Sequence, residues 1–339
     1  MSVRIAFMGF RQEHIDSMYR FAAAEDGRGC TVVAACEEDP GVRTALAAKY
    51  SIAYSNYRMM LDTVPCDVVE VCDYFGKRAA VVIEALRRGK HVLCDKPICT
   101  TLEEFRQIQK LRNERGLVVS IALDLRDRGN YQRMRELVQD GAIGEVHGVS
   151  VSGQHPLLIG IRPAWYFEEG KHGGTLNDLS VHAFDIIRWI TSMEFVEITA
   201  ARNWNAFAKD FPHFHDGAQF LAQMENGCGV LGDVSYFMPD SQGRVIDQYW
   251  RLTMYGTEGV IETSYPRGTV WMARRDRSDP EVFPSLPGTP GGYLRSFVRE
   301  ITGDCRNLSP SSADAMRAAG IALKAQHAAD NRLSQVKLC

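Results

Sequence analysis

Short apolar runs alternate with helical segments through the first third of the chain, and this rhythm limits the fold more than any other feature. Apolar runs bounded by polar turns are typical of parallel strands that are covered on both faces. The runs are Val3–Met8, Thr31–Cys36, Val68–Cys72, His91–Cys94 and Leu117–Ala122. The predicted helices between them are His14–Glu25, Pro40–Tyr50, Lys77–Arg88 and Thr101–Arg115. This order predicts an α/β fold that begins with a doubly wound parallel (Rossmann) sheet.

After Ala122 the rhythm changes to that of an antiparallel meander. A helix around Tyr131–Val138 precedes an alternating strand at Glu145–Gly153, and Gly- and Asn-containing turns join the runs that follow. These runs are Gln219–Met224, Gly229–Tyr236, Arg251–Tyr255 and Val260–Glu262. Arg274–Gly292 is predicted to be a long surface loop, followed by helices at Tyr293–Ile301 and Ser311–Ala329. We therefore expect a Rossmann domain over residues 1–122 and, over 123–339, an α+β domain with a large, mostly antiparallel open sheet.

The charge balance limits the classes of partner. The 339 residues include 39 basic and 42 acidic side chains, for a net charge of -3. That balance is too near neutral to steer the protein toward nucleic acid or an anionic membrane, so a small-molecule partner is favoured. No apolar run approaches the length of a membrane span, and the start of the chain leads into a strand without a signal-peptide pattern. We expect a cytoplasmic protein.

The cysteines and one histidine-rich segment raise the question of metal or disulfide. The nine cysteines form no Cys-x-x-Cys pair, and Cys36, Cys72 and Cys94 lie at predicted buried strands. They are interpreted as reduced core thiols. The segment His213-Phe214-His215-Asp216 has the composition of a metal site but lacks a third ligand at useful spacing, so no metal is expected.

Two segments combine ionisable residues with turn-forming residues. Asp95-Lys96-Pro97 ends one predicted strand, and about eighty residues later Asp178, His182 and Asp185 stand at i, i+4 and i+7. On a helix these three side chains share one face, for which Lys96 is the natural partner. A lysine, a histidine and a carboxylate around one hydroxyl can move its proton while a hydride leaves the carbon. The sequence therefore predicts alcohol–carbonyl interconversion on a nicotinamide cofactor.

The same two segments resemble the paired signature of one enzyme family. Glu-Lys-Pro after a strand, followed by Gly-Gly-Gly-x-x-x-Asp-x-Gly-x-His-x-x-Asp, marks the glucose-fructose oxidoreductase / inositol dehydrogenase / rhizopine-catabolism (Gfo/Idh/MocA) family. Here Asp95 replaces the glutamate, Thr175 the third glycine, and Ser180 the small residue before the histidine. The resemblance extends from Val3 to the C-terminal helix. It implies a sugar, inositol or related polyol as substrate, and a homodimer or homotetramer.

The first strand-to-helix turn is where a Rossmann domain binds pyrophosphate. It reads Gly9-Phe10-Arg11-Gln12-Glu13-His14, so only the first glycine of Gly-x-Gly-x-x-Gly is present. Gly9, Phe10 and Arg11 are candidate cofactor contacts. Arg11 stands at the second glycine, so either the cofactor is displaced or the guanidinium binds the pyrophosphate. A turn that merely connects strand and helix is the alternative.

Glu37, at the end of the second predicted strand, is the acid expected to bind the adenosine ribose and repel a 2′-phosphate, which favours NAD over NADP. A solvated turn that caps the next helix is the alternative. After the third strand, relatives carry Thr-Pro-Asn and a histidine, whereas this chain has Asp73-Tyr74-Phe75 and Arg78. Asp73 and Tyr74 are further candidate cofactor contacts, and Lys96 is expected to lie beside the cofactor as well as to act in catalysis.

The resemblance assigns roles to the remaining candidates. His182 would take the hydroxyl proton, Lys96 would stabilise the alkoxide or relay that proton, and Asp178 would hold the hydroxyl. Asp178 as a helix cap and His182 as a core histidine are the alternatives, while Asp185 is expected to orient His182. Substrate contacts are suggested by position only for Arg126, His155, Trp165 and Tyr236. Two competing functions remain: an NAD-dependent glycoside-cleaving enzyme, and a dinucleotide-binding sensor without catalysis.

Overall fold

The computed structural model describes residues 2–24 and 29–338 and divides into two compact units, each discontinuous in sequence. Unit 1 consists of Met1–Leu123, Pro163–Gly173 and Gly291–Ala319. Unit 2 consists of Asp124–Arg162, Gly174–Pro290 and Gly320–Cys339. Segments far apart in the sequence therefore fold together in each unit. That residues 1–122 and 123–339 are the two domains stays a prediction.

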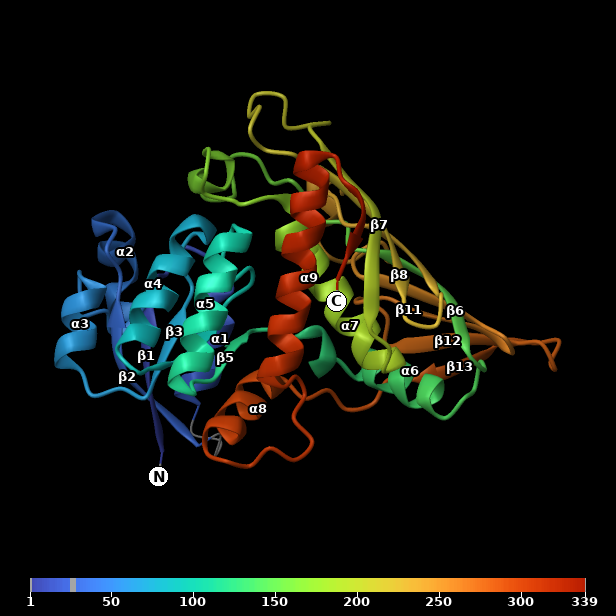
Figure 1. Ribbon diagram of the computed structural model, residues 1–339, viewed down its shortest axis with the longest axis horizontal. Coiled ribbons are helices and arrows are strands. Elements are labelled where there is room, and N and C mark those ends of the chain that lie inside the picture. The colour runs from blue at the N-terminus through green and yellow to red at the C-terminus, as the bar shows by residue number, and fades with distance from the viewer. Residues whose placement is uncertain (1, 25–28, 339) are drawn as a thin grey trace. The chain divides into compact units, whose positions relative to one another are not determined.

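Unit 1 contains the parallel sheet that the apolar runs predict (Figure 1). Its strand order is β2-β1-β3-β4-β5, and every neighbouring pair is parallel. The strands are β1 (Val3–Met8), β2 (Cys30–Cys36), β3 (Val68–Val71), β4 (His91–Cys94) and β5 (Val119–Ile121). The doubly wound sheet is thus confirmed. Strand order reverses between β1 and β3, which is where sheets of this type bind ligands.

Side chains of Asp39, Asn56 and Thr101 cap the N-termini of some helices of unit 1. The helices of this unit are α1 (Ile15–Ala23), α2 (Pro40–Tyr50), α3 (Tyr57–Thr63), α4 (Phe75–Arg87), α5 (Leu102–Arg115) and α8 (Gly292–Ile301). Thr101 and Glu104 form a capping box at the start of α5. The sequence analysis does not predict the short helix α3. Glu25, the predicted end of the first helix, lies outside the described residues. One face of the sheet is sealed by buried side chains of α1 and α8, among them Met18 and Phe297.

Unit 2 is a nine-stranded sheet in the order β13-β12-β11-β10-β6-β9-β8-β7-β14, in which only β6 and β9 pair in parallel. Figure 1 shows α6 (Gly129–Gln139) and α7 (Val181–Thr191) on one face of it. The mostly antiparallel sheet is confirmed. The strands are β6 (Val146–Ser152), β7 (Phe195–Trp204), β8 (Gly217–Met224), β9 (Gly229–Asp233), β10 (Arg251–Gly256), β11 (Gly259–Thr263), β12 (Thr269–Arg274), β13 (Glu281–Pro284) and β14 (Ser334–Lys337).

One predicted loop is wrong in part. Within Arg274–Gly292, the strand β13 pairs with β12 and ends the sheet. The segment looks like a loop because Asp, Pro, Gly and Ser dominate it, but an edge strand needs only one pairing partner and tolerates such residues. The long helix α9 (Ser312–Asn331) follows α8 near the C-terminus.

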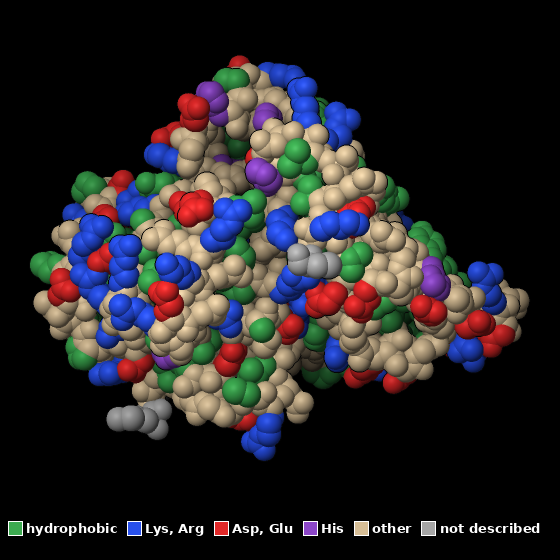
Figure 2. All heavy atoms as spheres, viewed as in Figure 1, with side chains coloured by type: hydrophobic (Ala, Val, Ile, Leu, Met, Phe, Trp, Pro, Cys, Tyr) green, Lys and Arg blue, Asp and Glu red, His purple; other side chains and the backbone are tan. Residues whose placement is uncertain are grey.

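Surface and cysteine chemistry agree with the composition. On the face shown in Figure 2, basic and acidic side chains are interspersed without a large patch of one sign. The eight described cysteines are free thiols. Burial raises the pKa of the Cys36 and Cys94 thiols to about 12. The described helices include none that is both long and apolar enough to cross a membrane.

Candidate functional site

The turn after β1 approaches the end of β3 closely. Gly9 has a φ of +85°, and a Cβ placed there would lie 2.6 Å from the Cβ of Asp73. Its N–H donates to the carbonyl of Cys36 at 3.0 Å. A side chain at position 9 would therefore push the turn away from β3. This explains why the first glycine is kept in an otherwise altered motif.

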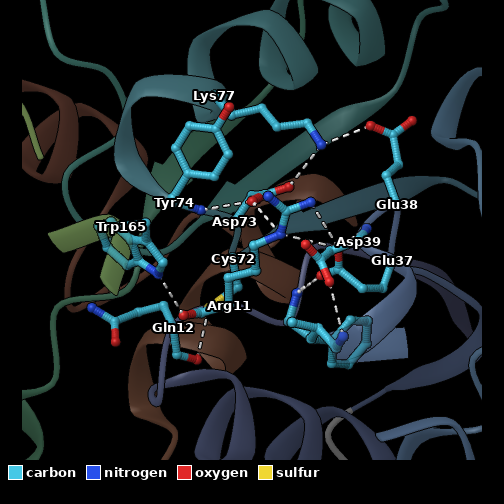
Figure 3. A network of polar contacts seen from close by, with 12 residues as sticks. Arg11, Gln12, Glu37, Glu38, Asp39, Cys72, Asp73, Tyr74, Lys77 and Trp165 are labelled. Atoms are coloured by element: carbon cyan, nitrogen blue, oxygen red, sulfur yellow. Dashed lines mark hydrogen bonds and ion pairs between the residues drawn. The ribbon is translucent and has the colours of Figure 1, made fainter. Parts of the chain in front are cut away.

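Glu37 is buried directly beyond β2 and is surrounded by donors (Figure 3). Oε2 accepts from the Phe10 N–H at 2.7 Å, and Oε1 accepts from the Asp39 N–H at 2.7 Å and from the Arg11 guanidinium at 3.0 Å. The two backbone donors fix the carboxylate at the β1 turn. Since a carboxylate oxygen has two lone pairs, Oε2 keeps the capacity for one more donor, as a ribose hydroxyl would require.

Arg11 lies over this acid. Its guanidinium pairs with Glu37 and, at 3.4 Å, with Asp73, and it faces the Tyr74 ring. The indole N–H of Trp165 donates to the Arg11 carbonyl at 3.0 Å. Arg11 is therefore held by two carboxylates, and the predicted contact with pyrophosphate, which would require it to leave or share them, stays a prediction.

A second cation completes this cluster. Lys77, in the first turn of α4, pairs with Glu38 at 2.6 Å and with Asp73 at 3.1 Å. We call Arg11, Glu37, Glu38, Asp73 and Lys77 the nucleotide cluster (Figure 3). Three carboxylates face two cations in it, so its net charge is negative. Such a cluster accepts ribose hydroxyls more readily than a 2′-phosphate.

Lys96 follows β4 in a turn that buried charges hold in place. Lys96 is 4% exposed and Asp95 is 1% exposed. Asp95 accepts from Arg78 Nη2 at 2.7 Å on one oxygen and lies 3.0 Å from His14 Nδ1 on the other. Burial alone would raise the pKa of Asp95, but the charges of His14 and Arg78 outweigh it and hold that pKa well below its usual range. Asp95 is thus an ionised anchor beside Lys96.

Glu70 in β3 contrasts with these compensated acids. It is fully buried, and neither carboxyl oxygen has a hydrogen-bond partner among the described residues. Burial raises its pKa to about 8, and the nearby Asp95 charge adds to the rise. Glu70 is therefore mostly protonated at neutral pH.

In unit 2, Asp178 lies in a π-helical turn, Leu176–Ser180, that leads into α7. The Tyr236 hydroxyl donates a short hydrogen bond to Asp178 Oδ2, and both side chains are buried. Neither helical segment has a side-chain cap. Asp178 is thus inside the helical stretch and is oriented by Tyr236 from the segment after β9, which is not the geometry of an N-cap.

His182 is one turn beyond Asp178 and lies against an aromatic wall, by which we mean His155, Tyr236, Tyr249 and Trp250. Its ring centroid is 5.1 Å from that of Trp250, and His155 lies 4.8 Å from Tyr249 and 6.0 Å from Tyr236. Two predicted substrate residues, His155 and Tyr236, thus belong to the same surroundings as Asp178 and His182. Aromatic faces suit the C–H-rich faces of a sugar or polyol.

Two other predicted substrate residues have different surroundings. Arg126 donates through Nε to Asp185 at 2.8 Å in a buried pair, so Asp185 binds Arg126 one turn beyond His182. Trp165 belongs to unit 1, where its ring lies 5.0 Å from that of Phe75. These contacts give both residues a structural role, and their substrate contacts stay predictions.

Two further motif residues have structural explanations. A Cβ at Gly174 would lie 2.1 Å from the Gln326 side chain, whose oxygen accepts from the Leu176 N–H. Gly174 therefore makes room for Gln326. Asp216, from the histidine-rich segment, accepts three backbone N–H groups from residues 206–208. No group of three or more His, Cys, Asp or Glu side chains suited to a metal occurs in the described ranges.

Sequence reasoning missed Lys77, Glu38 and Trp250. Lys77 stands in the sequence as the start of a predicted helix, and Glu38 as a neighbour of Glu37. Their ion pair joins residues 39 positions apart, and no periodicity reports such a contact. Trp250 has a φ of +54°, which is rare for a non-glycine residue, and its ring packs on Gly153, whose missing side chain was a possible signal.

Comparison with known families gives matches in both halves of the chain. Residues 3–123 match a family described as "Oxidoreductase family, NAD-binding Rossmann fold". Residues 131–262 match the "GFO/IDH/MocA C-terminal domain". Together the two matches cover most of the sequence, in the order in which the two signature segments occur.

Curated relatives and solved structures agree. The chain is 28% identical over 296 residues to D-glucoside 3-dehydrogenase of Escherichia coli, covering 82% of this chain and 77% of that protein. It is 25% identical to inositol 2-dehydrogenase of Rhizobium meliloti, covering 70% and 67%. The match to the uncharacterized oxidoreductase YrbE of Bacillus subtilis spans 63% of that protein. An inositol dehydrogenase homolog from Azotobacter vinelandii, complexed with NAD+, has the same fold, with a TM-score of 0.83 at 19% identity over 99% of this chain and 97% of that one.

Proposed function

Because the chain belongs to the Gfo/Idh/MocA oxidoreductase family, we propose that it is an NAD-dependent dehydrogenase that oxidises a secondary alcohol of a sugar, inositol or related polyol. One observation carries the proposal. Asp178 and His182 lie one helical turn apart on an aromatic wall, and the same chain holds Lys96 in a buried turn at the carboxyl end of β4. A non-catalytic binder has no need of such a set of proton-carrying groups.

The cofactor side of the proposed site is formed by residues of unit 1. Gly9 and Phe10 present backbone at the β1 turn, and Glu37 keeps one acceptor position for a ribose hydroxyl, so the residues present fit an NAD molecule. For that contact, the Arg11 guanidinium must move away from part of the Glu37 carboxylate. Asp73 and Tyr74 lie at the end of β3, on the other side of the strand-order reversal. The bound nicotinamide would supply the hydride acceptor.

On the substrate side, three residues would handle the hydroxyl proton. His182 would accept the proton, and Asp178, oriented by Tyr236, would accept a hydrogen bond from the hydroxyl. Lys96 would stabilise the alkoxide by its charge or relay the proton to solvent. His155 and the neighbouring rings would bind the apolar face of the substrate.

A substrate panel tests this proposal and separates the alternatives. The protein is incubated with NAD and a series of inositols, aldoses and polyols, and NADH absorbance is followed. We expect net NADH formation with at least one ring alcohol. Release of reducing sugar from a glycoside without net NADH would instead indicate the glycoside-cleaving function. Tight NADH binding without any turnover would indicate a sensor.

The open face of the unit 2 sheet supports a homodimer or homotetramer. Leu231 is 61% exposed and Tyr255 is 52% exposed on neighbouring parts of that face. Exposed apolar residues on a broad sheet are typical of an interface between copies. Light scattering on Leu231→Lys tests this, since we expect a monomer from the variant and an oligomer from the wild type.

The free thiols also support a cytoplasmic location, which cell fractionation would test.

A further inference from the structure

Three positions at which the chain departs from the family pattern contact one another in unit 1. His14 stands at the third glycine of the turn, Asp95 at the glutamate before the lysine, and Arg78 at the histidine beyond β3. Asp95 bonds Arg78 at 2.7 Å and His14 at 3.0 Å, each through a different oxygen. Asp95 is shorter than the glutamate of the family pattern, and Arg78 is longer than the histidine, so the two side chains still reach each other. These departures therefore compensate one another.

Arg78 ties this contact to the backbone on both sides. It is fully buried, and its other nitrogens donate to the carbonyls of Asp73 at 2.8 Å and Pro97 at 3.0 Å. The turn that contains Lys96 is therefore fixed at both ends, at Asp95 and at Pro97. The His14 contact connects this arrangement directly to the turn that follows β1. The Cys72 thiol adds a weaker link, since it lies 3.9 Å from both Asp95 Oδ2 and the Gln12 carbonyl.

His14 differs from the other two residues in its exposure. Its side chain is 32% exposed, whereas that of Asp95 is 2% exposed and that of Arg78 is completely buried. His14 immediately precedes α1, whose start is the part of the proposed site nearest the pyrophosphate in Rossmann domains. A replacement of His14 can thus remove one contact to Asp95 without opening a cavity in the core.

We propose that His14 is a positioning residue for Lys96, acting through the Asp95 carboxylate. The imidazole holds one oxygen of Asp95, Arg78 holds the other, and the peptide chain carries this restraint to the next residue. The cofactor-binding turn and the lysine of the proton relay are then linked through the hydrogen bond between His14 and Asp95. The inference rests on the proposed function for the role of Lys96, but not for the contact itself.

The first test uses the cofactor-free protein and no activity. Trace acetylation with acetic anhydride, read by mass spectrometry, measures the labelling rate of Lys96 against exposed Lys110 as an internal reference. We expect Lys96 in His14→Ala to label at least about 5-fold faster than in the wild type, because loss of a charge-assisted bond frees the turn. In His14→Asn, whose amide N–H can replace Nδ1–H, the rate returns toward the wild-type value.

The second test compares turnover with cofactor binding. We expect His14→Ala to lower kcat about 10-fold while the Kd of NADH stays within about 3-fold, and His14→Asn to recover most of kcat. Ser17→Ala is the matched control, since it removes a hydrogen bond to the His14 carbonyl and leaves the ring contact intact. That control should behave as the wild type in both tests.

The results that overturn the inference are distinct from those that overturn the function. Equal Lys96 labelling in the wild type and His14→Ala contradicts the positioning role, whatever the activity. A weaker Kd for NADH with unchanged kcat, equal in the Ala and Asn variants, would make His14 a phosphate contact instead. If the wild type turns over no alcohol, the proposed function fails, and the labelling rates still decide whether His14 holds Lys96.

Discussion

The proposed cofactor residues in unit 1 are paired charges, whereas the proposed substrate residues in unit 2 are a few polar groups among aromatic rings. In the nucleotide cluster, Arg11 and Lys77 are held by Glu37, Glu38 and Asp73. In unit 2, Asp178 is oriented by a tyrosine hydroxyl, and His182 lies edge-on to Trp250. The departures in the glycine turn and the lysine turn all lie on the charged side. If the proposed roles hold, cofactor binding tolerates exchange among ion pairs, while the proposed proton-transfer residues match the family pattern.

The largest expected effect concerns Glu70, a buried acid of unit 1 whose carboxyl oxygens have no hydrogen-bond partner among the described residues. The pKa of Glu70 is about 8 in the folded chain against an ordinary value of 4.5, so the unfolded chain loses this proton at lower pH. Stability from this group is complete below pH 4.5 and is lost as the pH rises toward 8. Glu70→Gln should therefore be more stable than the wild type by about 4 kcal/mol at pH 8.

Urea unfolding of the whole protein at pH 5 and pH 8 measures the free energy of unfolding of the variant and the wild type. We expect the two values to differ mainly at the higher pH. A difference that is the same at both pH values would show that the pKa of Glu70 in the folded chain is close to its ordinary value of 4.5. Glu70 would then be ionised and compensated, like the other buried acids described above.

Lys96→Ala tests whether unit 1 contributes to the chemical step as well as to cofactor binding. We expect kcat to fall by at least about 100-fold while NADH binds nearly as in the wild type, because a positioned acid–base group is lost. Stopped-flow turnover and NADH fluorescence titration measure the two quantities. Lys90→Ala is the control, since Lys90 lies in the same unit and donates to the Cys66 carbonyl. Wild-type turnover in Lys96→Ala would mean that Lys96 has no catalytic role and that unit 1 serves cofactor binding alone.

Tyr236→Phe is the matching test of the aromatic side. A hydrogen bond to a charged group is typically worth about 1.5–3 kcal/mol, so loss of the bond to Asp178 should lower kcat/KM for the alcohol about 10-fold or more. The Kd of NADH should not change. If instead NADH binding weakens and kcat/KM is retained, Tyr236 does not act through Asp178 on the substrate.

The smallest effect concerns cofactor choice. The negative nucleotide cluster should favour NAD over NADP in kcat/KM by at least about 10-fold, or about 1.4 kcal/mol. Glu38→Gln leaves Lys77 with one carboxylate partner fewer and should reduce the preference for NAD over NADP in kcat/KM. Steady-state kinetics with both cofactors measure it. Equal use of NAD and NADP by the wild type would mean that Arg11 and Lys77 outweigh the acids.

The sequence predicts the strands of the parallel sheet well, because continuous apolar runs report burial on both faces. It misses α3 and β13, which are short and carry weak periodicity. For the candidate site, the motif spacing predicts that Asp178 and His182 lie close together. It cannot predict that Arg11 covers Glu37 or that His14 reaches Asp95, since those contacts join residues 26 and 81 positions apart. Such pairings depend on the tertiary fold.

Hydride transfer from an alcohol carbon is the central claim, and isotope transfer tests it most directly. The best substrate of the panel, deuterated at the carbinol carbon, is oxidised with NAD, and the product NADH is examined by NMR. We expect deuterium at C4 of the nicotinamide ring in every turnover, with none released to water. Deuterium that stays in the sugar product, or that appears in solvent, would contradict it.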